Sequence, residues 1–426
     1  MYNPFILFFL FITINNAQIK LKFKRYYPKK EIYFNSIIIN DILTEIKLGT
    51  PSQNLTLSIR MLEYPTFVLN TSANSTVKNT NKFSEKNSST FIELRDYSII
   101  YGDEAFKKAY LGRDIFDLNN NKANANLMIA SDIENDIKFF DYSWLLPPSH
   151  SGVLGLNLFP QFESLQNTSL VLQLYKEKII DFCSFSFIFQ NNDQGYLILG
   201  KDFYYDENKY LFRKTELLSR KETLTWGIIF DNITFGNETI ENTYFKAKFK
   251  VELNMILTNN YMKEAFKNIF FQQYFEQNLC IQNKTDDNYT IYFICDKNIN
   301  IQKFPEIKFY MKDIDFELVL NYKDLFIEKE NKIYFLIIFQ KANKIWELGA
   351  PLFKKYPLIF DMDKKIIIFE KNNNTNYMIY FMILLIILII MLVLFIFRII
   401  KKRNNRVKAI ELDSEVNENY LNSTLI

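Results

Sequence analysis

Short runs of apolar residues that alternate with polar ones dominate the middle of the chain. Residues 44–59, "TEIKLGTPSQNLTLSI", alternate on both sides of a Gly-Thr-Pro turn, and a period of two is typical of half-buried strands. Only two segments, 169–180 and 259–277, have a helical period. Strand-like segments far outnumber these two, and no long alternation of strands with helices is present. We therefore predict an all-β fold with a few short helices.

The two halves of the chain also show a weak internal similarity. Each half contains a strand that is interrupted by charged residues and then continues as a second apolar run. Later in each half, an apolar pair ends in glycine. These segments are 44–68 with 151–160, and 244–266 with 345–353. A polar break near 213–223 divides the halves, so we expect two related β lobes at residues 40–213 and 214–371.

Two apolar segments lie outside these lobes. Residues 2–14 form a short apolar run with Ala17 soon after it, which resembles a secretory signal peptide; we expect residues 1–17 to be this leader, with an uncleaved anchor as the alternative. Residues 377–397 contain no charge and are long enough to cross a membrane as a helix. A basic cluster follows at once, which predicts that the tail, 398–426, is cytoplasmic.

These segments predict a single-pass type I membrane protein with a lumenal or extracellular body. The 426 residues are 48% hydrophobic, enough for two cores. Much of the net charge of +3 lies in the basic cluster after the predicted span, so nucleic acid is not an expected partner. A short basic segment, 18–39, precedes the first lobe.

The three cysteines fit an exported body. Cys280 and Cys295 flank a polar tip between strand-like ends, so we predict a hairpin disulfide, because disulfides persist in oxidising compartments. Cys183 alternates with phenylalanines and is expected to be a buried thiol. With no Cys-x-x-Cys and one histidine, we expect no metal site, no thiol-protease site and no cofactor.

Asn-x-Ser/Thr sequons are frequent in the body. They begin at Asn54, Asn70, Asn74, Asn87, Asn167, Asn232, Asn237, Asn283, Asn288 and Asn373. Any sequon that carries a glycan must lie at the surface. We expect the body to be a glycoprotein.

Several of these segments resemble the pepsin-like aspartic proteases. "EIKLGTPSQNLTL" (45–57) resembles the first strand and turn of that family, and "SGVLGLN" (151–157) resembles its Gly-Ile-Leu-Gly-Leu segment. Other blocks match in the family's order, at 81–91, 99–118, 195–212, 226–237, 304–309 and 345–371. The resemblance covers nearly all of 40–371 and implies the bilobal pepsin-like acid protease fold, with a cleft between its lobes.

The family's catalysis depends on two aspartates, one on an Asp-Thr/Ser-Gly turn in each lobe. The two carboxylates share a proton, so one acts as a base toward water and the other as an acid. Counting from the Gly-Thr-Pro turn at 49–51, the first aspartate position falls on Arg60; the second falls on Glu252 or Lys250. Neither Asp-Thr-Gly nor Asp-Ser-Gly occurs anywhere in the chain. Arginine stays protonated and cannot be the base.

Two further residues belong to the cleft in this alignment. Glu63, together with Glu252, is a conceivable replacement pair, but it would need a shifted backbone, and productive geometry tolerates little displacement. Tyr101 matches the tyrosine of the flap, which closes over substrate in the family. A strand aromatic that packs on the lobe is the alternative interpretation of Tyr101.

Two more polar residues have a predicted structural role. Glu347 replaces an apolar residue beneath the second turn, and a buried pair between it and Lys250 or Arg60 is one arrangement that the sequence suggests. His150 is the only histidine. Because no Gly-x-Ser-x-Gly elbow accompanies it, we expect a loop histidine rather than part of a catalytic triad.

The sequence therefore predicts a membrane-anchored, pepsin-like body that is catalytically inactive and binds a polypeptide in or near its cleft. Two alternatives stay open. The first is an active aspartic endopeptidase that uses displaced carboxylates and cleaves at acid pH. The second is a structural surface glycoprotein, in which Arg60 packs in an ion pair and no groove remains.

Overall fold

A computed structural model describes twelve stretches of the chain. They are residues 17–26, 41–61, 66–73, 81–97, 106–133, 150–158, 168–201, 209–215, 225–284, 290–341, 345–370 and 382–403. The chain divides into two compact units, Met1–Glu370 and Lys371–Ile426. Glu63, Tyr101 and residues 1–16 of the expected leader lie outside the described residues.

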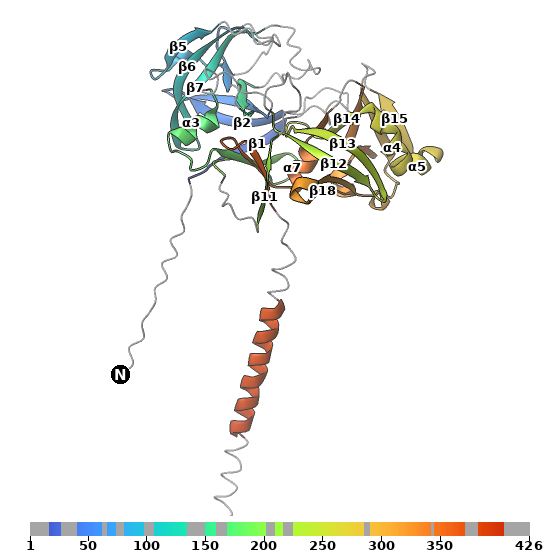
Figure 1. The fold of residues 1–426 in the computed structure, drawn as a ribbon. Helices are drawn as coiled ribbons and strands as arrows, with labels where there is room; N and C mark the ends of the chain where they lie inside the picture. The colour runs from blue at the N-terminus through green and yellow to red at the C-terminus, as the bar shows by residue number, and fades with distance from the viewer. Residues whose placement is uncertain are drawn as a thin grey trace, which may run out of the picture. The chain divides into compact units, whose positions relative to one another are not determined.

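The first sheet of the larger unit contains thirteen strands and includes segments from both ends of that unit (Figure 1). In hydrogen-bonding order they are β11 (Tyr210–Lys214), β24 (Ile366–Glu370), β23 (Leu358–Asp361), β9 (Ser184–Phe189), β10 (Gln194–Leu199), β1 (Ile19–Tyr26), β2 (Asp41–Leu48), β3 (Gln53–Arg60), β8 (Gly152–Gly155), β4 (Phe67–Leu69), β7 (Asn121–Ile133), β6 (Phe106–Leu118) and β5 (Ile92–Tyr97). β1 lies between β10 and β2, and β23 pairs with β9. Ile19–Tyr26, from the segment that precedes the first lobe, is therefore an integral strand of this sheet.

The second sheet contains eleven strands, among which β12 and β13 form a long hairpin (Figure 1). Its order is β18 (Phe316–Leu320), β17 (Ile307–Met311), β12 (Gly227–Phe235), β13 (Glu238–Phe249), β22 (Trp346–Leu348), β14 (Ile256–Asn259), β21 (Ile337–Gln340), β16 (Thr290–Asp296), β20 (Lys332–Phe335) and β19 (Phe326–Lys329), with β15 (Cys280–Lys284) paired to β16. β15 and β16 place Cys280 opposite Cys295, and the two form a disulfide. The predicted hairpin disulfide is confirmed.

The helices of the larger unit are short, and the two predicted helical segments are both helical. They are η1 (Glu85–Asn87), α3 (Leu170–Lys176), η2 (Asn260–Met262), α4 (Lys263–Phe266), η3 (Lys267–Phe271), α5 (Gln272–Glu276), η4 (Ile301–Lys303), η5 (Lys312–Ile314), α6 (Tyr322–Leu325) and α7 (Ala350–Lys355). The side chain of Ser169 accepts a hydrogen bond from the backbone of Leu172, which caps the start of α3. The fold is mostly β, as the alternating pattern predicts.

Each sheet contains the same three-strand arrangement, which explains the weak similarity between the two halves of the sequence. β8 is inserted between β3 and β4, parallel to the first and antiparallel to the second. β22 is inserted in the same way between β13 and β14. Glycine is required beside each insertion: a Cβ on Gly152 would lie 2.1 Å from the carbonyl oxygen of Phe67, and one on Gly349 would lie 2.0 Å from that of Met255.

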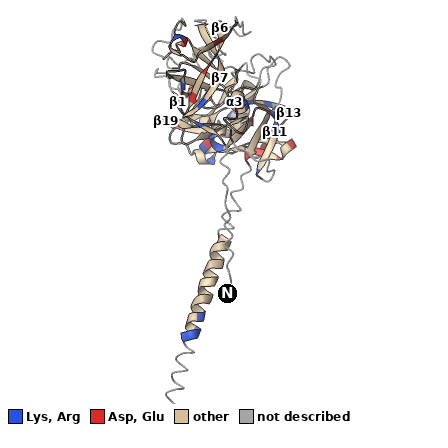
Figure 2. Cartoon of the chain, turned by 90° about the vertical axis from the view of Figure 1, so that its left-hand side faces the viewer, with Lys and Arg blue, Asp and Glu red and all other residues tan. Residues whose placement is uncertain are grey.

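The smaller unit contains one apolar helix, Met382–Arg403, which is long enough to cross a membrane. Its apolar side chains are exposed, as lipid contact requires. It covers most of the predicted span at 377–397 and continues to Arg403, with basic residues at its C-terminal end (Figure 2).

Candidate functional site

The ends of β3 and β13 occupy equivalent places in the two three-strand arrangements. Arg60, the last residue of β3, pairs with Gly155 of the inserted strand. On the other side, Phe249 of β13 pairs with Leu348, so the next residue, Lys250, comes opposite Gly349. The turns that follow these two strands are the candidate site.

Arg60 lies in a buried hydrogen-bonded network at the end of β3. Its guanidinium forms an ion pair with Asp41, and its Nε donates to Ser58 Oγ at 3.0 Å. Ser58 Oγ in turn donates to Asp41 Oδ1 at 3.1 Å. The Asp41 side chain is only 1% exposed and that of Arg60 15%, so each charge needs the other to offset its loss of hydration.

Asp41 is a site residue that the sequence reasoning missed. The β2–β3 hairpin pairs Leu43 with Ser58, so two residues further along its register Asp41 comes opposite Arg60. The signal is present in the sequence, because the Gly-Thr-Pro turn fixes the register. Counting back along both strands from that turn would have found the pair.

Lys250 is held by a carboxylate of its own. Its Nζ lies 2.8 Å from Glu347 Oε2, and the Nζ of Lys248 lies 3.0 Å from Glu347 Oε1. Burial raises the pKa of Glu347, but the attraction of Lys250 and Lys248 outweighs burial and brings the pKa below its usual value. The Lys250–Glu347 pair, one of the arrangements that the sequence suggested, is present.

Glu252 is the carboxylate of the second turn, and it is buried. Burial raises its pKa, while the charges of Arg60 and Lys250 and a hydrogen bond with the backbone of Met61 act in the opposite direction without reversing the shift. Its Oε2 has no hydrogen-bond partner among the described residues. Glu252 thus connects the two turns electrostatically, beside two cations that are each paired with another carboxylate.

Backbone contacts from distant strands hold both turns in place. Arg25 of β1 is buried and donates from Nη2 to the carbonyl of Val251 in the second turn at 3.1 Å. Trp226 donates from its indole nitrogen to the carbonyl of Leu156, just after β8, at 2.7 Å. The turns are therefore fixed by contacts between the two halves of the chain.

His150 precedes β8 outside any strand, as expected for a loop residue, but it is 2% exposed. Burial lowers its pKa to about 4, so the ring is neutral at pH 7. Asp41 and Arg60 act on it electrostatically in opposite directions. Neither ring nitrogen of His150 has a hydrogen-bond partner among the described residues, so no hydrogen-bonded triad includes it there.

Two further kinds of site, a reactive thiol and a metal site, were considered in the sequence. Cys183 is free and buried, and burial raises its thiol pKa to about 12, which is unfavourable for a reactive thiolate. Within the described stretches, no group of three metal-ligating side chains is present.

The comparisons with known proteins agree with this architecture. A family model described as eukaryotic aspartyl protease matches residues 42–371, which is most of the chain and spans both candidate turns. A search of curated proteins found no match to this chain.

Proposed function

Because the chain belongs to the eukaryotic aspartyl protease family, we propose that it is a membrane-anchored member that binds polypeptides and does not hydrolyse them. In this proposal a leader at 1–17 exports the body and a tail at 398–426 stays in the cytosol. The lobes at 40–213 and 214–371 hold the partner between or upon them.

One observation carries the proposal: at the end of β3, Arg60 forms an ion pair with Asp41. The aspartyl mechanism needs two carboxylates that share one proton across the two turns. By strand register Arg60 and Lys250 take the two equivalent positions, which favours Lys250 over Glu252 as the second. Neither a guanidinium nor an ammonium bound to a carboxylate can accept a proton from water.

The active-enzyme alternative would have to use Glu252 as one of its acids. Glu252 lies in the electrostatic field of Arg60 and Lys250, which works against a proton shared with a second carboxylate. The structural alternative predicts an ion pair at Arg60, and the Arg60–Asp41 pair favours it equally. Peptide binding separates it from our proposal.

A cleavage assay tests the lost chemistry. The full chain, purified in detergent, is incubated with a diverse peptide library from pH 3 to pH 7, and products are identified by mass spectrometry. We expect no cleavage that a pepstatin-type inhibitor blocks. Robust cleavage that Glu252→Gln abolishes and Glu264→Gln leaves intact would overturn the proposal; Glu264 is an exposed glutamate on α4 and serves as the matched control.

A binding assay tests the proposed activity. The same protein is immobilised and a peptide display library is selected on it. We expect enriched sequences whose retention falls in Tyr101→Ala, the proposed flap variant, and not in Tyr261→Ala, which removes an exposed tyrosine of η2. The absence of any enriched peptide would favour the structural alternative.

A further inference from the structure

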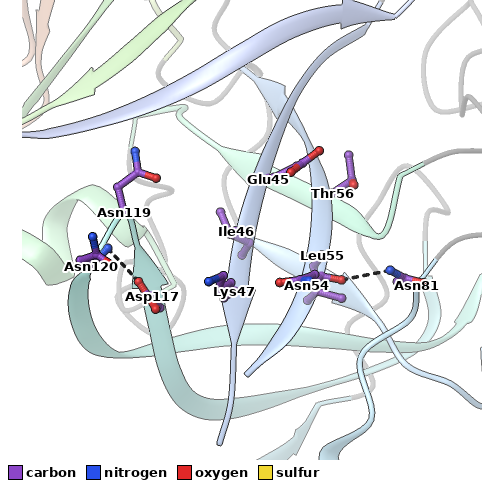
Figure 3. A pocket seen from close by; sticks show the side chains of 10 residues that line it. All are labelled: Glu45, Ile46, Lys47, Asn54, Leu55, Thr56, Asn81, Asp117, Asn119 and Asn120. Carbon is purple, nitrogen blue, oxygen red and sulfur yellow. Dashed lines mark hydrogen bonds between the residues drawn. The ribbon is translucent and has the colours of Figure 1, made fainter. Parts of the chain in front are cut away.

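A polar depression of about 610 Å³ opens on the outer face of β2 and β3 (Figure 3). In the strand register Lys47 is opposite Asn54 and Glu45 is opposite Thr56. Residues two apart on a strand share a face, so these four side chains point outward together. Ile46 and Leu55, between them, are buried in the core.

Asn54 and Thr56 are the first and third residues of a sequon, Asn54-Leu55-Thr56. The Asn54 side chain is exposed, and its amide makes no hydrogen bond within the described residues; the side chain of Asn81 donates to the backbone carbonyl of Asn54 at 3.4 Å and not to this amide. The amide nitrogen is therefore open to modification in the folded body.

A second sequon, Asn70-Thr71-Ser72, has the opposite environment. Asn70 is 4% exposed, and its Nδ2 donates to Glu85 Oε1 at 3.0 Å and to the hydroxyl of Tyr110 at 3.2 Å. A glycosylated amide keeps only one N–H and would need room for a sugar. A glycan on Asn70 is therefore incompatible with these contacts.

We propose that Asn54 carries an N-linked glycan whose first sugar lies in the depression, whereas Asn70 carries none. The inference rests on the proposed export of the body, with which the Cys280–Cys295 disulfide agrees. A lipid-pyrophosphate-linked oligosaccharide is the donor. The bond between its sugar C1 and the phosphate oxygen breaks, a C1–Nδ2 bond forms on Asn54, and the amide gives up one proton as the lipid pyrophosphate leaves.

The lining of the depression suits a sugar ring, which presents hydroxyl and acetamido groups. Lys47 and Asn81 offer donors, Glu45 offers acceptors, and Asn119 and Asn120 form the turn at the opposite rim (Figure 3). Asn119 and Asn120 have φ of 54° and 71°, values that asparagine adopts more readily than most residues. Asp117 accepts from the backbone of Asn120 at 2.9 Å, which stabilises this turn.

Site occupancy is the first test. The full chain is produced in cultured eukaryotic cells, and membrane-fraction peptides are deglycosylated in heavy-oxygen water and sequenced by mass spectrometry. We expect the label at Asn54 and none at Asn70. A label at Asn237, which lies exposed in the β12–β13 turn, with an unlabelled Asn54 would overturn this inference alone; no label at any exposed sequon would overturn it together with export.

Paired variants sharpen the test. Thr56→Ala should remove the mass of one glycan, and Thr56→Ser should retain it, because serine preserves the sequon. Ser72→Ala destroys the Asn70 sequon at an exposed residue and should leave the mass unchanged. Loss of a glycan in Ser72→Ala, or no loss in Thr56→Ala, would contradict the proposal.

The position of the sugar is tested by enzyme access. An endoglycosidase should release the Asn54 glycan from native protein more slowly than the Asn237 glycan, and denaturation should abolish the difference. Equal native rates would show that the glycan projects freely and would overturn its placement in the depression. The cleavage assay described for the proposed function is independent of all three tests.

Discussion

At the scale of single residues, the two turns carry charges that are neutralised within each half. Arg60 is paired with Asp41 on its own hairpin, and Lys250 with Glu347 on the neighbouring inserted strand. The charges of both Arg60 and Lys250 act on Glu252. The charges of each turn are thus neutralised within its own half, whereas Glu252 and hydrogen bonds to the backbone connect the two halves.

The first prediction concerns Glu252 and pH. Folding raises the pKa of Glu252, so the native protein binds this proton more tightly than the unfolded chain does, and ionised Glu252 destabilises the fold above its folded pKa. Glu252→Gln, which mimics the neutral form, should therefore unfold at a higher temperature than the parent at pH 7.5. This advantage should disappear as the pH falls toward the unfolded pKa of about 4.3, as measured by tryptophan fluorescence of the full chain in detergent.

Glu347 is the matched control, since its pKa is shifted in the opposite direction. Folding lowers it, so its stabilisation is present above the unfolded pKa and is lost as the pH falls through the folded pKa. Glu347→Gln should therefore destabilise the protein at pH 7.5. If both glutamines shifted the unfolding temperature in the same direction, the assignment of Glu252 would be wrong.

The second prediction concerns the Arg60–Asp41 pair. Asp41→Asn leaves a nearly buried guanidinium without its counterion, and such a loss destabilises by about 3 kcal/mol. Arg60→Met alone should also destabilise, and the double variant should recover part of the loss, since replacing both members by uncharged groups removes the unpaired charge. A double-mutant cycle from urea unfolding measures the coupling; additive losses would contradict a direct pair.

For single residues, the sequence could place a side chain only where the pairing register of the strands could be counted from a turn. The Arg60 position followed from the Gly-Thr-Pro turn, whereas Asp41 was missed because only a count along both strands brings it opposite Arg60. For the second turn, the register of the β12–β13 hairpin shifts between Phe230 and Asn232, so a simple count from its turn does not fix the position, and the sequence left Glu252 and Lys250 open. The pairing of β13 with β22, strands far apart in the chain, supplies the register there.

At the scale of elements, the alternation of apolar and polar residues and the short spacing of two cysteines were sufficient to predict the strands and the disulfide. The hairpin of β15 and β16 joins cysteines 15 residues apart, and both flanks alternate as strands do. Helix α3 has Ser169 at its start as a visible cap. Such features are local, which is why the sequence alone identified them.

The third prediction concerns this disulfide. A bridge that closes a loop of this length contributes about 3 kcal/mol in the chain-entropy estimate, so Cys280→Ser combined with Cys295→Ser should lower the free energy of unfolding by about that amount. The parent should fall to the same level in reductant. Cys183→Ala is the control: it removes the free thiol but keeps the disulfide, so reductant should lower its free energy of unfolding by the same amount as in the parent. A parent whose stability ignored reductant would contradict the prediction.

At the scale of the whole molecule, the local pattern of apolar and polar residues could not predict that strands from both expected lobes join in the first sheet. β1, from the segment expected to precede the lobes, and β23 and β24, from the end of the second expected lobe, all lie in that sheet. Which strands pair across hundreds of residues depends on the edges that each half leaves open, and these edges exist only in the folded body. The resemblance to a family supplied the bilobal architecture that periodicity could not.

The last prediction concerns the membrane. Met382–Arg403 is apolar and exposed, and its basic residues are at its C-terminal end, where positive charge favours the cytosolic side. The full chain should stay in carbonate-washed membranes, whereas a chain that ends at residue 376 should be released as soluble protein. In sealed microsomes, protease should remove a tag placed after Ile426 and spare the body. A protected tag with a digested body would reverse the proposed orientation, and with it the compartment in which the disulfide and the Asn54 glycan would have to form.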